Sequence, residues 1–126
     1  MTSSKTWDDA RSYCQSLSGE LASITSSGTN DFLTTLTKSV ALIGGYRVGR
    51  TWRWSDGSTW GYTNWHSGQP DNNLGKQDKT QFNWGSVGKW DDLSTTDTRP
   101  FICQIKLGGK LGNDKKANNN KHNLIF

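Results

Sequence analysis

The sequence lacks any uninterrupted apolar run of the roughly 20 residues that a membrane-spanning helix requires. Residues 1–5 also lack the apolar stretch of a signal peptide. We therefore expect no membrane span, and this observation alone leaves the chain as either a cytosolic protein or a trimmed mature form.

Aliphatic residues are scarce, and hydrophobic residues make up only 31% of the 126 positions. Seven Trp, four Phe and three Tyr offset this scarcity, because each aromatic side chain buries a large area. The length suits one domain with a single modest core. We expect that core to be built around four of the tryptophans: Trp52, Trp54, Trp60 and Trp90.

The sequence also has only two cysteines, Cys14 and Cys103, near opposite ends of the expected domain. A bond between them would close a long loop and contribute about 4–5 kcal/mol on the chain-entropy model. Their spacing alone fits either one disulfide or two buried thiols.

Catalytic motifs are missing as well. The only histidine within residues 1–106 is His66, and no nucleophile with an assigned base accompanies it. Asp91 and Asp92 are adjacent, so on a strand their side chains point to opposite faces and form no simple acid pair. We therefore expect a binding protein and not an enzyme.

Positive charge is concentrated at the end of the chain. Residues 107–126 hold four lysines and one aspartate, a net charge of +3, so the total of +4 leaves +1 for residues 1–106. We interpret residues 1–106 as the domain and residues 107–126 as a basic, Asn/Lys-rich, flexible tail, and we expect no nucleic-acid partner.

Two helices are predicted in the first third of the chain. Thr6 resembles an N-cap before apolar residues at helical spacing from Trp7 to Leu17, with Cys14 on the buried side. Ser27 is the expected cap of a second helix reaching Lys38. In that helix we expect an inward face that consists of Phe32, Leu33, Leu36 and Val40.

Short strands are predicted after the helices. Residues 40–46 are apolar, and residues 51–60 suggest a hairpin around Asp56 and Gly57. Residues 61–78 show no periodicity, which indicates a long functional loop. Three further strands are expected in the segments 80–84, 88–93 and 99–105, so the fold class is α+β.

The long loop gathers oxygen atoms around one proline. Gln69 and Asp71 flank Pro70, and Asp91 and Asp92 lie on a later predicted strand. Hard cations such as calcium take six to eight oxygen ligands from such groups. A cis bond before Pro70 would let both flanking side chains point the same way, so the pattern indicates one calcium ion.

Six ordered motifs resemble a C-type lectin-like domain over residues 5–105. They are TWDDARSYCQSLSGELASI, IGG, WRWSDGS, NWHSGQPDNN, KWDD and RPFICQ. The resemblance implies an α+β C-type lectin-like fold in which two helices flank small antiparallel sheets with a long calcium- and sugar-binding loop. It also implies a disulfide between Cys14 and Cys103 and a secreted, extracellular protein.

The same resemblance implies a calcium-dependent, non-catalytic lectin whose partner is a carbohydrate. Gln69, Pro70 and Asp71 look like the galactose-type triplet of the family. The implied calcium ligands are Gln69, Asp71, Gln77, Asp91 and Asp92. The residues expected around the sugar are Gln69, Asp71, Gln77, Asp91, Trp65, His66 and Trp84.

Several positions depart from the family pattern. Gln77 replaces the usual Glu ligand, Asp91 replaces an Asn, and Asn73 stands where galactose binders carry a stacking Trp. Lys79 and Thr95 occupy the positions of the family's second disulfide. These departures keep open an alternative function, which is the binding of a protein, mineral or ice surface without sugar.

The usual edge strand before the first helix has only residues 1–5 available. The last predicted strand would then have an unpaired edge. Residues 1–5, the tail or a second copy of the chain could cover that edge, and the polar tail makes a homodimer the favoured choice.

Overall fold

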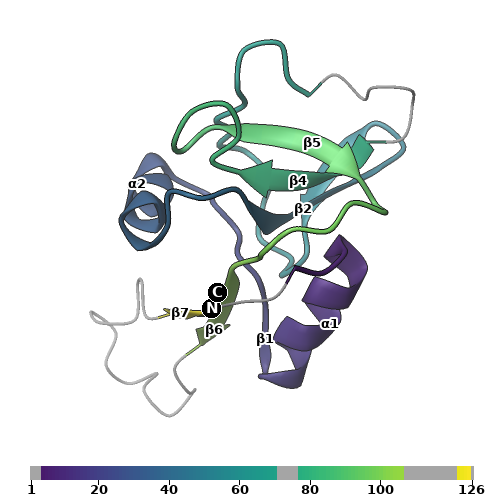
Figure 1. Cartoon of the computed structure of the whole chain (residues 1–126), viewed down its shortest axis with the longest axis vertical. Helices are drawn as coiled ribbons and strands as arrows, with labels where there is room; N and C mark the ends of the chain where they lie inside the picture. Colours follow the sequence, from purple (N-terminus) through teal and green to yellow (C-terminus); the bar gives the residue numbers. More distant parts are fainter. Residues whose placement is uncertain (1–3, 71–76, 107–121, 126) are drawn as a thin grey trace.

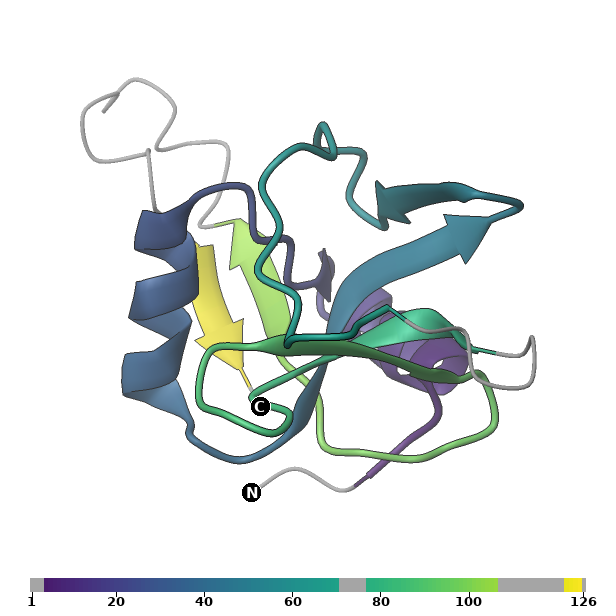
Figure 2. The same cartoon turned by 90° about the horizontal axis from the view of Figure 1, so that it is seen from above.

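The computed structural model of the chain describes residues 4–70, 77–106 and 122–125 (Figure 1). Its two helices are α1 (Trp7–Ser16) and α2 (Ser27–Leu36), which lie on opposite sides of the molecule (Figures 1 and 2). Neither helix within the described ranges is long and apolar enough to cross a membrane. The expected α+β fold is confirmed.

Helix α1 begins where the sequence predicts. The hydroxyl of Thr6 accepts a hydrogen bond from the backbone N–H of Asp9 at 3.2 Å, which satisfies one of the free N–H groups of the first turn. The buried side of the helix carries Trp7, Ala10 and Cys14. Capping and apolar spacing therefore agree on the position and the orientation of α1.

Helix α2 differs from the prediction in its cap and in its buried face. Its N-cap is Ser26, one residue before the expected Ser27, and the helix ends at Leu36. Leu33 is buried, but Phe32 and Leu36 are 50% and 37% exposed, so the predicted inward face is wrong at those two positions. The buried polar residue Asn30 takes part of that face instead.

The smaller sheet has three antiparallel strands in the order β1-β6-β7. They are β1 (Gly19–Leu21), β6 (Cys103–Lys106) and β7 (His122–Ile125). The backbone of Cys103 pairs with Leu21 on one side and with Ile125 on the other. The end of the chain thus covers the edge that we had assigned to a second copy, so this edge no longer argues for a dimer.

The larger sheet has four antiparallel strands in the order β3-β2-β4-β5. They are β2 (Ala41–Val48), β3 (Thr51–Trp54), β4 (Gln77–Phe82) and β5 (Trp90–Ser94). Figure 2 shows the β2 and β3 strands reaching away from β4 and β5. The predicted strand segments 40–46, 80–84 and 88–93 overlap β2, β4 and β5.

The predicted hairpin around Asp56 and Gly57 is wrong. The two-residue connection between β2 and β3 contains Gly49, with φ of 63°, and Val48 pairs with Thr51. Gly57 has φ of 86° and lies in a turn after β3, where its N–H donates to the carbonyl of Trp54. Both glycines supply a left-handed turn, but only the chain after Gly49 returns along its partner strand.

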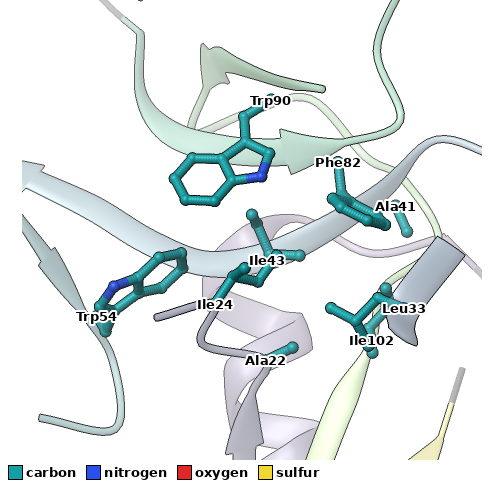
Figure 3. Packing of buried hydrophobic residues seen from close by; sticks show 9 residues of the cluster. All are labelled: Ala22, Ile24, Leu33, Ala41, Ile43, Trp54, Phe82, Trp90 and Ile102. Carbon is teal, nitrogen blue, oxygen red and sulfur yellow. The ribbon is translucent and has the colours of Figure 1, made fainter. Parts of the chain in front are cut away.

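The core forms two clusters. Figure 3 shows the first: Ala22, Ile24, Leu33, Ala41, Ile43, Trp54, Phe82, Trp90 and Ile102. The second consists of Trp7, Ala10, Cys14, Leu21, Leu42, Leu93, Phe101 and Cys103. The prediction of core tryptophans is confirmed for Trp54 and Trp90, whereas Trp52 and Trp60 are only half-buried.

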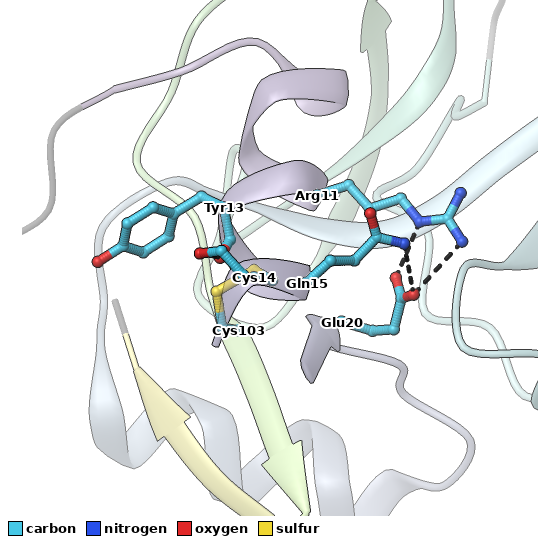
Figure 4. The surroundings of a disulfide bond; sticks show 7 residues. Arg11, Tyr13, Cys14, Gln15, Glu20 and Cys103 are labelled. Atoms are coloured by element: carbon cyan, nitrogen blue, oxygen red, sulfur yellow. Dashed lines mark hydrogen bonds and ion pairs between the residues drawn. A yellow bond between two sulfur atoms is a disulfide. The ribbon is translucent and has the colours of Figure 1, made fainter. Parts of the chain in front are cut away.

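Cys14 and Cys103 form the disulfide that the resemblance implies, with 5.4 Å between their Cα atoms and a sequence separation of 89. Both are fully buried, and the bond joins α1 to β6 (Figure 4). Beside it, Arg11 pairs with Glu20 at 2.9 Å. The first helix and the last strand of the main domain are thus covalently tied.

Asp56 lies in the turn after β3 and connects that turn to the smaller sheet. One carboxylate oxygen accepts from the hydroxyl of Ser23 at 2.7 Å and from the side-chain amide of Gln104 at 2.8 Å. The other accepts from the backbone N–H of Ser58 at 2.8 Å. Burial raises the pKa of Asp56, but the hydrogen bonds from Ser23, Ser58 and Gln104 outweigh it, so the net pKa is lowered.

We expect Asp56→Asn to reduce the free energy of unfolding by about 1–2 kcal/mol near pH 7, since the amide NH₂ of Asn would meet donors and the carboxylate is lost. The folded pKa lies below the ordinary value of about 3.9, so the carboxylate stabilises the fold above about pH 4 and that stability disappears as pH falls through the folded pKa. Denaturant melts across pH would test this. Asp31→Asn, an exposed change on α2, is the control, and an equal loss near pH 7 and pH 2 would contradict the assignment.

Candidate functional site

The long loop is fixed to the start of β5 by backbone hydrogen bonds. The N–H of His66 donates to the carbonyl of Trp90 at 2.8 Å, and the N–H of Trp90 donates to the carbonyl of Asn64 at 3.0 Å. The side-chain amide of Asn64 also donates to the carbonyl of Gly88 at 2.7 Å. The loop therefore runs beside the residue that precedes Asp91.

Gln69 follows this anchor closely. Its N–H donates to the carbonyl of His66 at 2.9 Å, and the bond between Gln69 and Pro70 is cis. The side-chain oxygen Oε1 of Gln69 is buried and accepts no hydrogen bond within the described part of the chain. Asp71, the last residue of the Gln-Pro-Asp triplet, lies outside the described residues, and so does Asn73.

Asp91 and Asp92 are both on β5 and are 6% and 0% exposed. The backbone partners of Asp91 and Asp92 on β4 are Gln81 and Thr80. The amide of Gln81 donates to Oδ2 of Asp91 at 2.6 Å. Buried carboxylates need such donors or a cation, so both acids lie in a polar part of the interior.

Gln81 belongs to a short chain of hydrogen bonds that the sequence analysis missed. While its amide donates to Asp91, its oxygen accepts from Nε of Arg99 at 3.1 Å. Gln81 is itself 2% exposed. The sequence offers no local signal for Gln81, because Asp91 and Arg99 lie 10 and 18 positions away along the chain.

Gln77 lies at the start of β4, away from the pair of Gln81 and Asp91. It pairs with Ser94 at the start of β4, four positions from the Gln81 that pairs with Asp91. Four residues of a strand span about 13 Å. The backbone carbonyl of Gln77 accepts from the guanidinium of Arg47 at 3.0 Å, which fixes the start of β4 to β2.

Aromatic rings surround the loop. The rings of His66 and Trp84 meet edge to face with 5.2 Å between their centroids. Trp65 packs against Trp52 at 5.1 Å and against Trp90 at 5.6 Å. His66, Trp65 and Trp84 are all half-buried, so each keeps part of its surface available to a ligand.

The oxygen atoms of the site are of the kind that binds a hard cation, although the described acidic side chains do not form a cluster. Among the described residues, no group of three His, Cys, Asp or Glu side chains gathers at one point. Amide oxygens are not among these four types of side chain, and Asp71 lies outside the described residues. The candidate donors that are described are the oxygens of Gln69, Gln77, Asp91 and Asp92, which are ligands of the kind calcium takes.

A disulfide-tied α+β fold with a long loop anchored at a polar strand defines a small binding domain. Residues 3–105 match the family described as the lectin C-type domain. The chain therefore belongs to the C-type lectin domain family, whose members are non-catalytic binding domains. Disulfide-containing domains of this family are typical of extracellular proteins.

Two of the similar proteins have the same sequence identity to this chain. The chain is 39% identical to a lectin from Pleurodeles waltl over 111 residues, which cover 79% of this chain and 64% of that protein. It is 39% identical to a perlucin-like protein from Mytilus galloprovincialis over 110 residues, which cover 79% and 69%. The chain thus spans less than two thirds of the Pleurodeles lectin.

Solved structures share the same fold. The C-type lectin CEL-I from Cucumaria echinata matches with a TM-score of 0.76 at 28% identity, covering 82% of this chain and 84% of that one. A calcium-independent type II antifreeze protein matches with a TM-score of 0.75 at 29% identity, covering 81% and 79%. The likeness therefore includes both a lectin and a protein described as independent of calcium.

Proposed function

We propose that this domain binds galactose-type sugars through one calcium ion, without catalysis, in an extracellular setting. The proposed calcium ligands are Gln69, Asp71, Gln77, Asp91 and Asp92. The sugar would contact Gln69, Asp71, Gln77 and Asp91, together with some of the aromatic residues Trp65, His66 and Trp84.

The observation that carries this proposal is the side-chain oxygen of Gln69. It is buried and no described residue donates to it, a condition that costs about 1–3 kcal/mol when nothing compensates. A cation bound there would compensate that oxygen. The buried carboxylates Asp91 and Asp92 on the adjoining strand would supply the charge that a divalent ion needs.

The sugar preference follows from the order of groups around Pro70. Before the proline, the amide of Gln69 offers both a donor and an acceptor, whereas the carboxylate of Asp71 after it only accepts. Each of two neighbouring sugar hydroxyls must donate one hydrogen bond and accept another, and the side chains on either side of Pro70 determine the direction of these bonds. The Gln-Pro-Asp order therefore supports the galactose-type arrangement that the family resemblance implies.

Three aromatic residues near the loop are the candidates for stacking on the sugar. Asn73, at the position of the usual Trp, offers no ring. The edge-to-face pair of His66 and Trp84 is half-buried, so one ring face could pack on the apolar side of a sugar. Trp65 is the third candidate.

The proposal as a whole is tested on immobilised galactose. We expect the protein to be retained with millimolar calcium and to elute with a chelator or with free galactose. Retention on immobilised mannose under the same conditions measures selectivity. Failure to bind either resin with calcium present would contradict sugar binding.

We expect Asp92→Asn to abolish calcium binding, because it removes a charged ligand from the buried end of the site. Titration calorimetry with calcium measures the effect, and circular dichroism verifies that the variant is folded. Asp78→Asn, on the same sheet but outside the proposed ligand set, should retain the wild-type heat. Unchanged calcium binding by the Asp92 variant would remove Asp92 from the ligand set.

Gln81→Met should weaken calcium binding about tenfold or more, since loss of an outer hydrogen-bond partner of a ligand typically reduces metal affinity by 10–100-fold. Methionine keeps the length and packing of the side chain but cannot hold the carboxylate of Asp91. Calorimetry provides the affinity. Gln15→Met on the exposed face of α1 is the matched control, and equal effects of the two changes would show that Gln81 does not position Asp91.

The double change Gln69→Glu and Asp71→Asn should move the preference from galactose toward mannose while the summed charge of the two side chains stays the same. It exchanges the acid and the amide across Pro70, which reverses the donor and the acceptor offered to the hydroxyls. Competition by the two free sugars on one resin measures the ratio. A double variant that still prefers galactose would refute the hydrogen-bond argument.

A second candidate function is the binding of a protein, mineral or ice surface without sugar. The supporting observations are the similarity to a calcium-independent type II antifreeze protein and the distance of Gln77 from Asp91 along the sheet. This candidate predicts no galactose retention and no calcium heat. A homodimer also stays a prediction, which sedimentation would test.

A further inference from the structure

A cavity of about 320 Å³ opens beside β3, one of the two edge strands of the larger sheet. Its walls include Trp52, Trp54 and Trp60, while Arg53 and Ser58 contribute polar groups. The volume is at the lower end of the 300–1,000 Å³ typical of small-ligand sites, so it suits a single sugar ring.

The walls of the cavity are aromatic. The rings of Trp52 and Trp60 are nearly parallel, at 21°, with 5.8 Å between centroids. Trp54 and Trp60 are 4.6 Å apart at 31°. Trp52 and Trp60 are half-buried, so part of each ring is free to pack against the C–H face of a ligand.

Trp54 contributes a hydrogen-bond donor that the protein itself does not use. The residue is 2% exposed, and its Nε1 has no acceptor among the described residues. Figure 3 shows the nitrogen on the side of the ring away from Ile24 and Ile43. A buried tryptophan normally finds an acceptor for this N–H. Because Nε1 is itself buried, a ligand oxygen in the cavity reaches it only when the neighbouring side chains move aside.

The charge beside the cavity is positive. Arg53 is exposed, and within the described residues its guanidinium has no hydrogen bond or ion pair. Arg47 on the paired strand lies over the ring of Trp52 at 5.4 Å. The nearest carboxylate in sequence, Asp56, is already held by Ser23, Ser58 and Gln104. An anionic ligand therefore meets a free cation.

This cavity is distinct from the proposed calcium site. It lies at β3, whereas Asp91 and Asp92 are on β5, and these two strands form opposite edges of the four-stranded sheet. None of the four proposed calcium ligands that the structure describes, Gln69, Gln77, Asp91 and Asp92, lines it. A ligand here would need no metal ion.

We propose that the β3 cavity is a second, calcium-independent site for an anionic sugar. The ring of the sugar packs on Trp52 and Trp60, one of its oxygens accepts from Nε1 of Trp54, and its sulfate or carboxylate pairs with Arg53. The proposal does not depend on the calcium-dependent function proposed above, because every measurement that tests it is made in the presence of a chelator.

Nuclear magnetic resonance tests the site through the indole N–H signals of the seven tryptophans. The probes are galactose 6-sulfate, glucuronic acid and neutral galactose, each added with EDTA at low ionic strength. We expect either anionic sugar to shift the Trp54 signal, which Trp54→Phe identifies by its loss, together with the signals of Trp52 and Trp60. A stronger response to one anionic sugar identifies the acid group.

Arg53→Gln should weaken binding of the anionic probe about fivefold, the size expected when an exposed charge pair is lost. Arg53 is exposed, so this change leaves the fold intact. Arg50→Gln, a nearby exposed change that does not line the cavity, is the control. The proposal is overturned by the absence of a Trp54 shift, by equal binding of neutral galactose, or by equal losses in the two variants.

Discussion

Trp90 is the residue on which the arrangement of the core, the long loop and the candidate site depends. Its ring is fully buried against Trp54, Trp60 and Trp65. Its indole N–H donates to Asn30 of α2 at 2.8 Å, and its backbone joins the loop on both sides of Trp65. Because Asp91 follows directly, the same contacts that hold the core together also set the loop beside the carboxylates.

A second constraint acts at Lys79, one of the two positions where the family resemblance implies a further disulfide. Lys79, at one of the family's cysteine positions, lies 4.2 Å from the ring centroid of Trp7 and 5.6 Å from that of Tyr46. Its ammonium is also 3.8 Å from Asp8, which is 71% exposed, so that pair is weak. The cation–π contacts are stronger where the cation is shielded from water, and the Lys79 side chain is only 13% exposed. They join β4 to α1 without a covalent bond.

The sequence predicted the features that local chemistry determines. Helix α1 was predicted correctly because the Thr6 cap and the apolar spacing agree. The hairpin was misplaced because Asp56-Gly57 is a stronger local turn signal than Gly49-Arg50, although pairing over the whole sheet decides the outcome. Strand β7 covers the edge of β6. The tail was one of three candidates for that role, but a second copy was favoured because most of residues 107–126 are polar or charged. The contact of Gln81 with Asp91 and Arg99 depends likewise on pairing between separate strands.

The tryptophans explain how a chain with few aliphatic residues has both a core and surfaces for ligands. Trp54 and Trp90 supply buried area, while Trp52, Trp60 and Trp65 pack on them and stay half-exposed. An aliphatic side chain that is half-exposed has little specific to offer a ligand, whereas an indole keeps a polarizable face and an N–H donor. The ring contacts run from Trp52 through Trp65 to Trp90, so stability and recognition use the same side chains. A substitution in this series must therefore be judged by both folding and binding measurements.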